Sequence, residues 1–223
     1  DGIAALVREH GITELAWMRA ADRGTDDRIR ATCGRLGIAH RTVPDAAFLT
    51  PEAEVDAWYA EHEHARMEDF YRWQRRRTGI LMHGESPVGG QWNYDHDNRE
   101  PLPRGGIVVP PLPEPRHDDL TRATIAEVRE RFASHPGDAR DLWVPITRRS
   151  ALHWLQRFVD ERLHDFGRYE DAMHRDEPVL LHSVLTPMLN VGLLHPSEVV
   201  DAVLERSGDV PLASLEGFLR QIV

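Results

Sequence analysis

The chain has 223 residues, of which 41% are hydrophobic and 29% charged, and its formal net charge is −10. This length allows one large hydrophobic core or two small ones. The negative total excludes a protein that coats nucleic acid with a generally basic surface, so any contact with DNA or RNA should be local. All 27 basic residues are arginine, which a GC-rich genome explains and which makes every cation a planar, permanently charged group.

The N-terminal part of the chain shows a β–α–β pattern. The expected elements are a helix over residues 1–10, a strand over 12–18, a helix over 26–36 and a strand over 38–43. Gly11 and Gly37 end the two helices. This order is typical of a parallel α/β sheet. Because two strands do not make a stable sheet alone, we expect the other strands to lie outside this sequence.

A helical pattern then runs from Thr50 to about Thr78, with a break near His62. Thr50 offers a capping hydroxyl, and Pro51 suits the first helical position. Residues 79–118 are rich in glycine and proline and therefore predict an extended connector. A connector of this length favours a functional role.

From Asp118 onward the pattern is helical. We expect a helix over residues 121–132, one capped by Thr147, one over 196–206 and a last one that opens at Pro211. The helix after Thr147 carries an apolar face of Ala151, Leu152, Leu155, Phe158, Val159 and Leu163. The sequence thus predicts an α/β remnant followed by a mostly α-helical domain, with a predominantly helical fold overall.

Several sites and locations are excluded by composition. One cysteine, Cys33, allows neither an internal disulfide nor a cysteine-rich metal site, and we expect it to be a small core residue. His62 and His64 point different ways on a helix, so no metal site is predicted. No apolar run approaches the length of a membrane span, and we expect a cytoplasmic protein. Both ends of the chain stop within a helical pattern, which predicts a piece of a longer protein.

The most distinctive stretch is FYRWQRRRTGILMHGESPVGGQWNYDHDNR, residues 70–99. Residues 66–79 hold five arginines against two acidic residues, a local charge of +3 that leaves −13 for the rest of the chain. Guanidinium groups beside aromatic rings suit phosphates and bases. The alternative is a solvated face on which Glu68 and Asp69 pair with Arg72. The candidate DNA-binding residues are Arg72, Arg75, Arg76, Trp92 and Tyr94.

A second stretch, YEDAMHRDEPVLLHSVLTPMLNVGLLHP, covers residues 169–196. Ser183 and Thr186 flank two apolar residues there, and Pro187 follows. Hydroxyl groups and unpaired backbone N–H groups at the start of a helix bind phosphate well. The alternative is that Ser183 only caps the helix.

The second stretch resembles the flavin-phosphate segment of the photolyase/cryptochrome superfamily, (S/T)-x-L-(S/T)-P-x-L-x-x-G. The matching positions are Ser183, Leu185, Thr186, Pro187, Leu189 and Gly192. His182 stands where many members have threonine. RRRTGILMHGESPVGGQWNYDHDNREPLP in the first stretch is similar to the deoxyribodipyrimidine photolyase-related proteins, the iron–sulfur bacterial branch of cryptochromes and photolyases. The two motifs occur in the order that this branch has.

The resemblance implies a division of the chain and a flavin site. Residues 1–50 would be the C-terminal part of an α/β antenna domain, residues 51–118 interdomain helices and a connector, and residues 119–223 the first part of a helical FAD-binding domain. The implied FAD-binding residues are Tyr169, His182, Ser183, Leu185, Thr186 and Leu189, with Gln221 as a weaker candidate. A ribityllumazine antenna and an iron–sulfur cluster are implied for the family only, because their binding segments lie outside this sequence.

The activity that the resemblance implies is flavin-dependent, light-driven repair of pyrimidine photolesions in DNA. The parent protein would be a deoxyribodipyrimidine or (6-4) photolyase, a lyase in which excited reduced FAD transfers an electron to a flipped-out lesion. We expect the partial chain to be inactive alone, and its catalytic residues stay unassigned. Two alternatives remain open, a blue-light photoreceptor without repair activity and a cofactor-free interaction module. The arginine run then fits DNA contact or interdomain packing equally, and Trp92 with Tyr94 fits a DNA-facing loop or a hairpin anchor.

Overall fold

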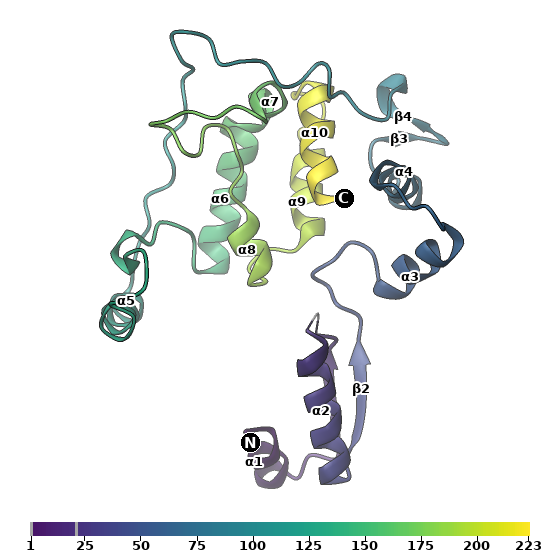
Figure 1. The fold of residues 1–223 in the computed structure, drawn as a ribbon, viewed down its shortest axis with the longest axis vertical. Helices are drawn as coiled ribbons and strands as arrows, with labels where there is room; N and C mark the ends of the chain where they lie inside the picture. The colour runs from purple at the N-terminus through teal and green to yellow at the C-terminus, as the bar shows by residue number, and fades with distance from the viewer. Residues whose placement is uncertain (1, 21) are drawn as a thin grey trace. The chain divides into compact units, whose positions relative to one another are not determined.

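The computed structural model describes residues 2–20 and 22–223 (Figure 1). Two compact units follow each other along the chain, residues 1–65 and residues 66–223. The described residues are predominantly helical, and they include two small sheets of two strands each. The predicted fold class is therefore confirmed. No helix in the described part of the chain is long and apolar enough to cross a bilayer.

The first unit contains the predicted β–α–β arrangement. Its elements are α1 (Gly2–His10), β1 (Glu14–Met18), α2 (Arg23–Leu36), β2 (Ala39–Val43) and α3 (Glu52–Glu61). The strands β1 and β2 pair in parallel, with Glu14 opposite Ala39 at one end of the register. Gly37 ends α2 in the left-handed conformation, φ 65°, as its position predicts. Cys33 lies on α2 and is fully buried, which confirms its expected core role.

Two helix starts differ from the sequence-based prediction. Helix α2 begins at Arg23 rather than at residue 26, because the Asp22 carboxylate accepts hydrogen bonds from the backbone N–H groups of Gly24 and Thr25. Helix α3 begins at Glu52, with Pro51 rather than Thr50 in the capping position and without a side-chain cap. The expected break near His62 is present, since α3 ends at Glu61 and the next helix starts at Met67.

The second unit holds the remaining elements. They are α4 (Met67–Thr78), β3 (Met82–His83), β4 (Ser86–Pro87), η1 (Val88–Gly90), α5 (Asp119–Arg131), η2 (Ala139–Asp141), α6 (Arg148–Glu161), α7 (Leu163–Phe166), η3 (Gly167–Tyr169), α8 (Thr186–Asn190), α9 (Pro196–Leu204) and α10 (Leu212–Ile222). The hairpin β3–β4 is antiparallel and lies inside the segment predicted as an extended connector. A turn around Gly84, φ 60°, makes it possible.

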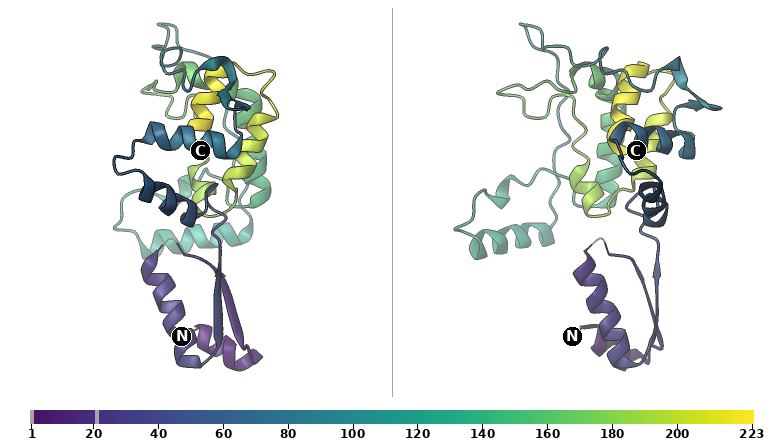
Figure 2. Two further views of the ribbon diagram at one scale, coloured as in Figure 1. Left: turned by 90° about the vertical axis from the view of Figure 1, so that its right-hand side faces the viewer. Right: turned by 45° about the vertical axis from the view of Figure 1, so that its right-hand side comes forward.

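The core of the second unit lies among α6, α7, α9 and α10, which pack side by side in both views of Figure 2. Three phenylalanine rings meet there: the Phe158 ring centroid is 4.7 Å from that of Phe218, and the Phe166 centroid is 5.4 Å from it. Thr147 caps α6 as predicted, in a reciprocal pair with Ser150. Leu152 departs from the predicted apolar face and is 40% exposed, because it lies one residue, about 100°, from buried Ala151 on the helix.

Candidate functional site

Arg75 of α4 lies inside the second unit and is 1% exposed. Its guanidinium donates hydrogen bonds to three backbone carbonyls, those of Ile80 at 3.2 Å, Leu81 at 2.5 Å and Trp92 at 3.1 Å. Leu81 is held at a φ of 51°, a conformation that a side chain disfavours. Arg75 therefore fixes the loop that follows α4. The Arg75 guanidinium is therefore enclosed by its own unit rather than presented to DNA. All three bonds lie within residues 66–223, so they do not bear on the alternative of interdomain packing.

Trp92 lies half-buried beside the arginines of α4. The guanidinium carbons of Arg72, Arg75 and Arg76 are 5.5, 5.4 and 4.7 Å from its ring centroid. Arg72 also pairs with Glu68 one turn earlier, as the solvated-face alternative predicts. Arg76 is exposed and makes no ion pair among the described residues. Among the predicted DNA contacts, Arg76 is thus exposed, whereas Arg72 and Trp92 are only partly accessible.

Tyr94 is an anchor of the hairpin. It is 8% exposed, and its hydroxyl donates to the Val88 carbonyl at 3.2 Å. Gly89 passes so close that a Cβ there would lie 2.0 Å from the Tyr94 hydroxyl oxygen. The predicted DNA contact of Tyr94 is therefore contradicted, because the ring and its hydroxyl are both enclosed by the chain.

A buried carboxylate, Glu216 of α10, joins this part of the chain to the helical core. The Tyr71 hydroxyl donates to one Glu216 oxygen at 2.8 Å, and the Tyr94 amide donates to the other at 3.2 Å. Burial, and then the adjacent Glu216 charge, raise the pKa of Tyr71, which keeps its hydroxyl protonated as a donor. Arg220, one turn along α10, lies 3.4 Å from Glu216 and also pairs with Asp95.

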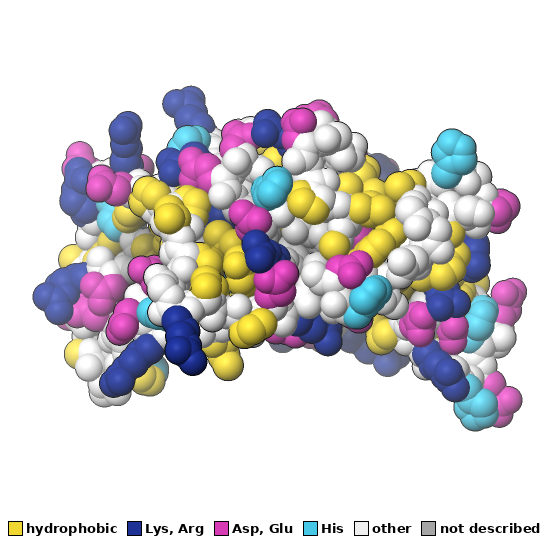
Figure 3. Space-filling model, turned by 90° about the horizontal axis from the view of Figure 1, so that it is seen from above, with side chains coloured by type: hydrophobic (Ala, Val, Ile, Leu, Met, Phe, Trp, Pro, Cys, Tyr) yellow, Lys and Arg dark blue, Asp and Glu magenta, His cyan; other side chains and the backbone are white. Residues whose placement is uncertain are grey.

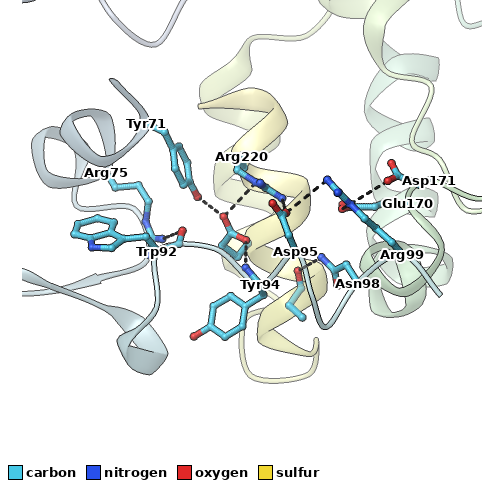
Figure 4. Close-up of polar contacts among 12 residues, drawn as sticks. Tyr71, Arg75, Trp92, Tyr94, Asp95, Asn98, Arg99, Glu170, Asp171 and Arg220 are labelled. Atoms are coloured by element: carbon cyan, nitrogen blue, oxygen red, sulfur yellow. Dashed lines mark hydrogen bonds and ion pairs between the residues drawn. The ribbon is translucent and has the colours of Figure 1, made fainter. Parts of the chain in front are cut away.

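The network continues from the hairpin to the second motif. The side-chain amide of Asn98 donates to the Ala213 carbonyl at 3.2 Å. Arg99 Nε lies 2.9 Å from Asp171 and 3.7 Å from Glu170. Burial raises the pKa of the Glu170 carboxyl. Residues 92–99 are therefore fastened both to α10 and to the segment that follows Tyr169 (Figure 4).

Sequence reasoning missed Glu216, although one signal was present. Glu216 stands in the middle of an otherwise apolar helix pattern, LASLEGFLRQI, where a charged residue requires partners. Its partners Tyr71 and Tyr94 are more than 120 residues away along the chain. Their identity could not be read from a pattern that repeats over a few residues.

The predicted flavin segment forms a loop whose apolar residues are anchored in the core. Leu185 is 1% and Tyr169 is 7% exposed. His182 lies half-buried, with one ring nitrogen 2.9 Å from the Val179 carbonyl and the other 2.9 Å from the Glu170 carbonyl. His182 thus ties the loop to the chain beside Tyr169.

The hydroxyl groups of this loop are left without partners. Helix α8 starts after Leu185 with no side-chain cap, so the alternative that Ser183 caps the helix is wrong. The Ser183 carbonyl accepts a hydrogen bond from the Trp154 indole at 2.8 Å. Neither the Ser183 hydroxyl, which is half-buried, nor the exposed Thr186 hydroxyl has a hydrogen-bond partner among the described residues. Both groups are available to a ligand.

Two further residues of the predicted flavin set are Leu189 and Gln221. Leu189 is half-buried on α8, and Gln221 is exposed near the end of α10. Helix α10 packs against η3, which carries Tyr169. Val184 is held at a φ of 52°, a left-handed conformation that costs a β-branched residue roughly 1–3 kcal/mol. The loop is therefore held in a defined shape by its surroundings.

Comparison with known proteins identifies the family of this chain. The sequence model of the family described as deoxyribodipyrimidine photo-lyase-related protein matches residues 1–143. The chain belongs to this family. The resemblance seen in the sequence is thereby confirmed, and the photolyase-related motif at residues 70–99 lies within the matched region.

Individual relatives of this photolyase-related protein have been found in bacteria and a virus. A (6-4) photolyase of Agrobacterium fabrum is 39% identical over 193 residues, which are 85% of this chain and 38% of that protein. The uncharacterized protein R853 of Acanthamoeba polyphaga mimivirus is 45% identical over 58 residues, 25% of this chain and 45% of that protein. The crystal structure of a bacterial class III photolyase from Agrobacterium tumefaciens matches 99% of this chain, and the match covers 40% of the photolyase chain, with a TM-score of 0.54 and 18% sequence identity. This last likeness shows the photolyase fold, and the chain spans 38% of the length of the (6-4) photolyase.

Proposed function

We propose that this photolyase-related chain forms part of a flavin-dependent, light-driven photolyase that repairs pyrimidine photolesions in DNA. Membership of the family and 39% identity to a (6-4) photolyase support a photolyase-like function. The observation that carries the flavin step is the pair of unpartnered hydroxyls, Ser183 and Thr186, on a loop anchored by Leu185. Such donors at the start of a short helical turn match the needs of a phosphate.

In this proposal the chain holds the ribityl-phosphate part of FAD. Ser183 and Thr186 would donate hydrogen bonds to it, Leu189 and Gln221 would line the site, and the buried Tyr169 would support it from the core. Leu185 and His182 would keep the loop in place, because their side chains are already engaged with the protein. When bound, FAD would supply light absorption and electron transfer to the lesion.

The proposed DNA contact is narrower than the sequence suggested. Arg76 and the half-buried Trp92 beside it are the candidates, with Arg72 as a weaker one because Glu68 already pairs with it. On the face shown in Figure 3, arginine side chains are interspersed with acidic ones, which agrees with a local contact. We also retain the proposed division into an antenna remnant at residues 1–50, an interdomain region at 51–118 and a flavin domain from 119.

The flavin step is tested in a chimera, because this chain spans only 38% of the (6-4) photolyase. Residues of this chain replace the matched 193 residues of that protein, and flavin bound per chain is measured after purification. Ser183→Ala and Thr186→Val should each weaken flavin retention by about 1–3 kcal/mol, since each removes a hydrogen bond to a charged group. Ser207→Ala, an exposed hydroxyl on the same unit, is the control and should retain flavin fully.

The same chimera separates the alternatives. Light-dependent restoration of oligonucleotides that carry (6-4) or cyclobutane lesions supports the photolyase. Flavin binding without repair of either lesion would instead indicate a photoreceptor. A chimera that folds but retains no flavin would indicate an interaction module. Equal flavin retention in both hydroxyl variants and the parent would contradict the proposed phosphate contacts.

A further inference from the structure

A cleft of about 720 Å³ opens at the start of α6. It borders the loop that carries Ser183, because the lining residue Trp154 is hydrogen-bonded to the Ser183 carbonyl. One wall is the end of the connector, residues 113–117, and the other is the segment that enters α6 at residues 143–157. The connector wall leads into α5, and the other wall continues into α6 (Figure 1). The volume lies within the range of small-molecule sites, and the lining contains none of the proposed flavin or DNA residues.

The cleft offers an aromatic surface. The indole of Trp143 is 39% exposed, and its ring centroid lies 5.8 Å from that of Trp154 at an angle of 45°. Trp154 is itself 4% exposed and is fixed by its hydrogen bond to the Ser183 carbonyl. An exposed indole held against a fixed one is suited to stack a planar ring such as a nucleobase.

The cleft is also cationic, in a chain whose net charge is −10. Arg116 and Arg149 line it, and neither makes an ion pair or a side-chain hydrogen bond among the described residues. A third arginine, Arg157, is already held by Glu161. Glu114 supplies the one carboxylate among the lining side chains. Two unpaired guanidinium groups on facing walls are a strong attraction for a phosphate.

A third observation points to a missing partner. The Nε2 atom of His117 is buried and has no hydrogen-bond partner in the part of the chain that the structure describes. Buried polar atoms are nearly always hydrogen-bonded. His117 lies on the connector wall next to Arg116, so this wall carries a buried polar atom without a partner.

We propose that this cleft binds a nucleotide, with its base stacked on Trp143 and its phosphate paired with Arg116 and Arg149. The same chemistry is presented by a free mononucleotide and by an unpaired nucleotide of a DNA strand. The proposal does not depend on the flavin site, because the residues of the two sites differ.

Isothermal titration of the 223-residue chain with AMP and TMP tests the proposal. Adenosine, which lacks the phosphate, and inorganic phosphate, which lacks the base, are titrated in parallel. We expect saturable binding of the nucleotides that is about tenfold or more tighter than that of either part. Equal binding of adenosine and AMP, or no binding of any nucleotide, would overturn it.

Variants locate the binding. Trp143→Ala and Arg149→Gln should each weaken nucleotide affinity about tenfold, whereas Trp143→Phe keeps a stacking ring and should bind nearly as the parent does. Arg175→Gln, an exposed arginine outside the cleft, is the matched charge control. Thermal unfolding of each variant checks that the unit is intact. Unchanged affinity in both cleft variants would place the nucleotide elsewhere and refute the assignment.

Short thymidine oligomers distinguish the two sources of the nucleotide. If an oligomer binds more tightly than TMP and the cleft variants lower both affinities, the cleft holds a nucleotide of a strand. If TMP and the oligomer bind equally per site, the ligand is a free nucleotide. An oligomer whose binding is insensitive to both Trp143→Ala and Arg149→Gln contradicts a strand in the cleft.

Discussion

Removing the hydroxyl of Tyr71 should destabilise the second unit by a measurable amount. The hydroxyl donates to Glu216 at 2.8 Å, and Glu216 is 0% exposed. A hydrogen bond to a buried charged group contributes roughly 1.5–3 kcal/mol. Arg220 at 3.4 Å still compensates part of the Glu216 charge, so we place the cost of Tyr71→Phe at about 2 kcal/mol.

Urea unfolding followed by circular dichroism measures this cost. With an m-value of about 2 kcal/mol/M, the midpoint should fall by about 1 M at unchanged m. Tyr169→Phe is the matched control, because Tyr169 is equally buried but its hydroxyl has no hydrogen-bond partner in the described residues. That variant should change stability by less than about 0.5 kcal/mol. Hydrogen exchange at the Tyr94 amide, which also bonds Glu216, should accelerate in Tyr71→Phe alone.

A double-mutant cycle makes the reasoning refutable. If Tyr71 acts through Glu216, the cost of Tyr71→Phe should shrink clearly in a Glu216→Gln background. Equal costs in both backgrounds would show that the hydroxyl contributes through other contacts. An equal loss of stability in Tyr169→Phe would show that the effect belongs to any buried tyrosine.

Three further predictions concern the hairpin, a surface ion pair and the DNA contact. Gly89→Ala should destabilise by more than Gly84→Ala, because only at Gly89 would the new Cβ meet Tyr94, at 2.0 Å, in addition to a positive φ; equal midpoints in urea would contradict this. The hydrogen bond from Arg148 lowers the pKa of Glu198 from 4.5 to about 2. Because the pKa of Glu198 is lower in the folded state, the ion pair stabilises the fold fully above pH 4.5, and this stabilisation is lost as the pH falls toward 2. Glu198→Gln should therefore remove this part of the acid dependence of the unfolding midpoint. In the chimera, Arg76→Ala should weaken DNA binding. The slope of log affinity against log salt concentration should become shallower by about 0.9, the value for one phosphate contact. An unchanged slope would favour a structural role for Arg76.

Local patterns in the sequence were enough to predict most elements. Gly37 and Thr147 marked a helix end and a helix start because the backbone geometry at these points depends on the nearest few residues. The parallel pairing of β1 and β2 followed from the helix between them. The family was also recognisable from two continuous motifs, since a linear motif is contained in the sequence itself.

Tertiary structure alone decided what the arginine-rich motif does. Its sequence shows charge beside aromatic rings, but burial depends on which distant segments cover each side chain. Arg75 is enclosed by the carbonyls of the following loop. The Tyr94 hydroxyl packs against Gly89, and the Tyr94 amide donates a hydrogen bond to Glu216 on α10. Arg76, the next residue on the same helix, remains exposed. Neighbours in sequence thus acquire opposite roles, because the path of the loop after α4, rather than residue type, determines which guanidinium group reaches solvent.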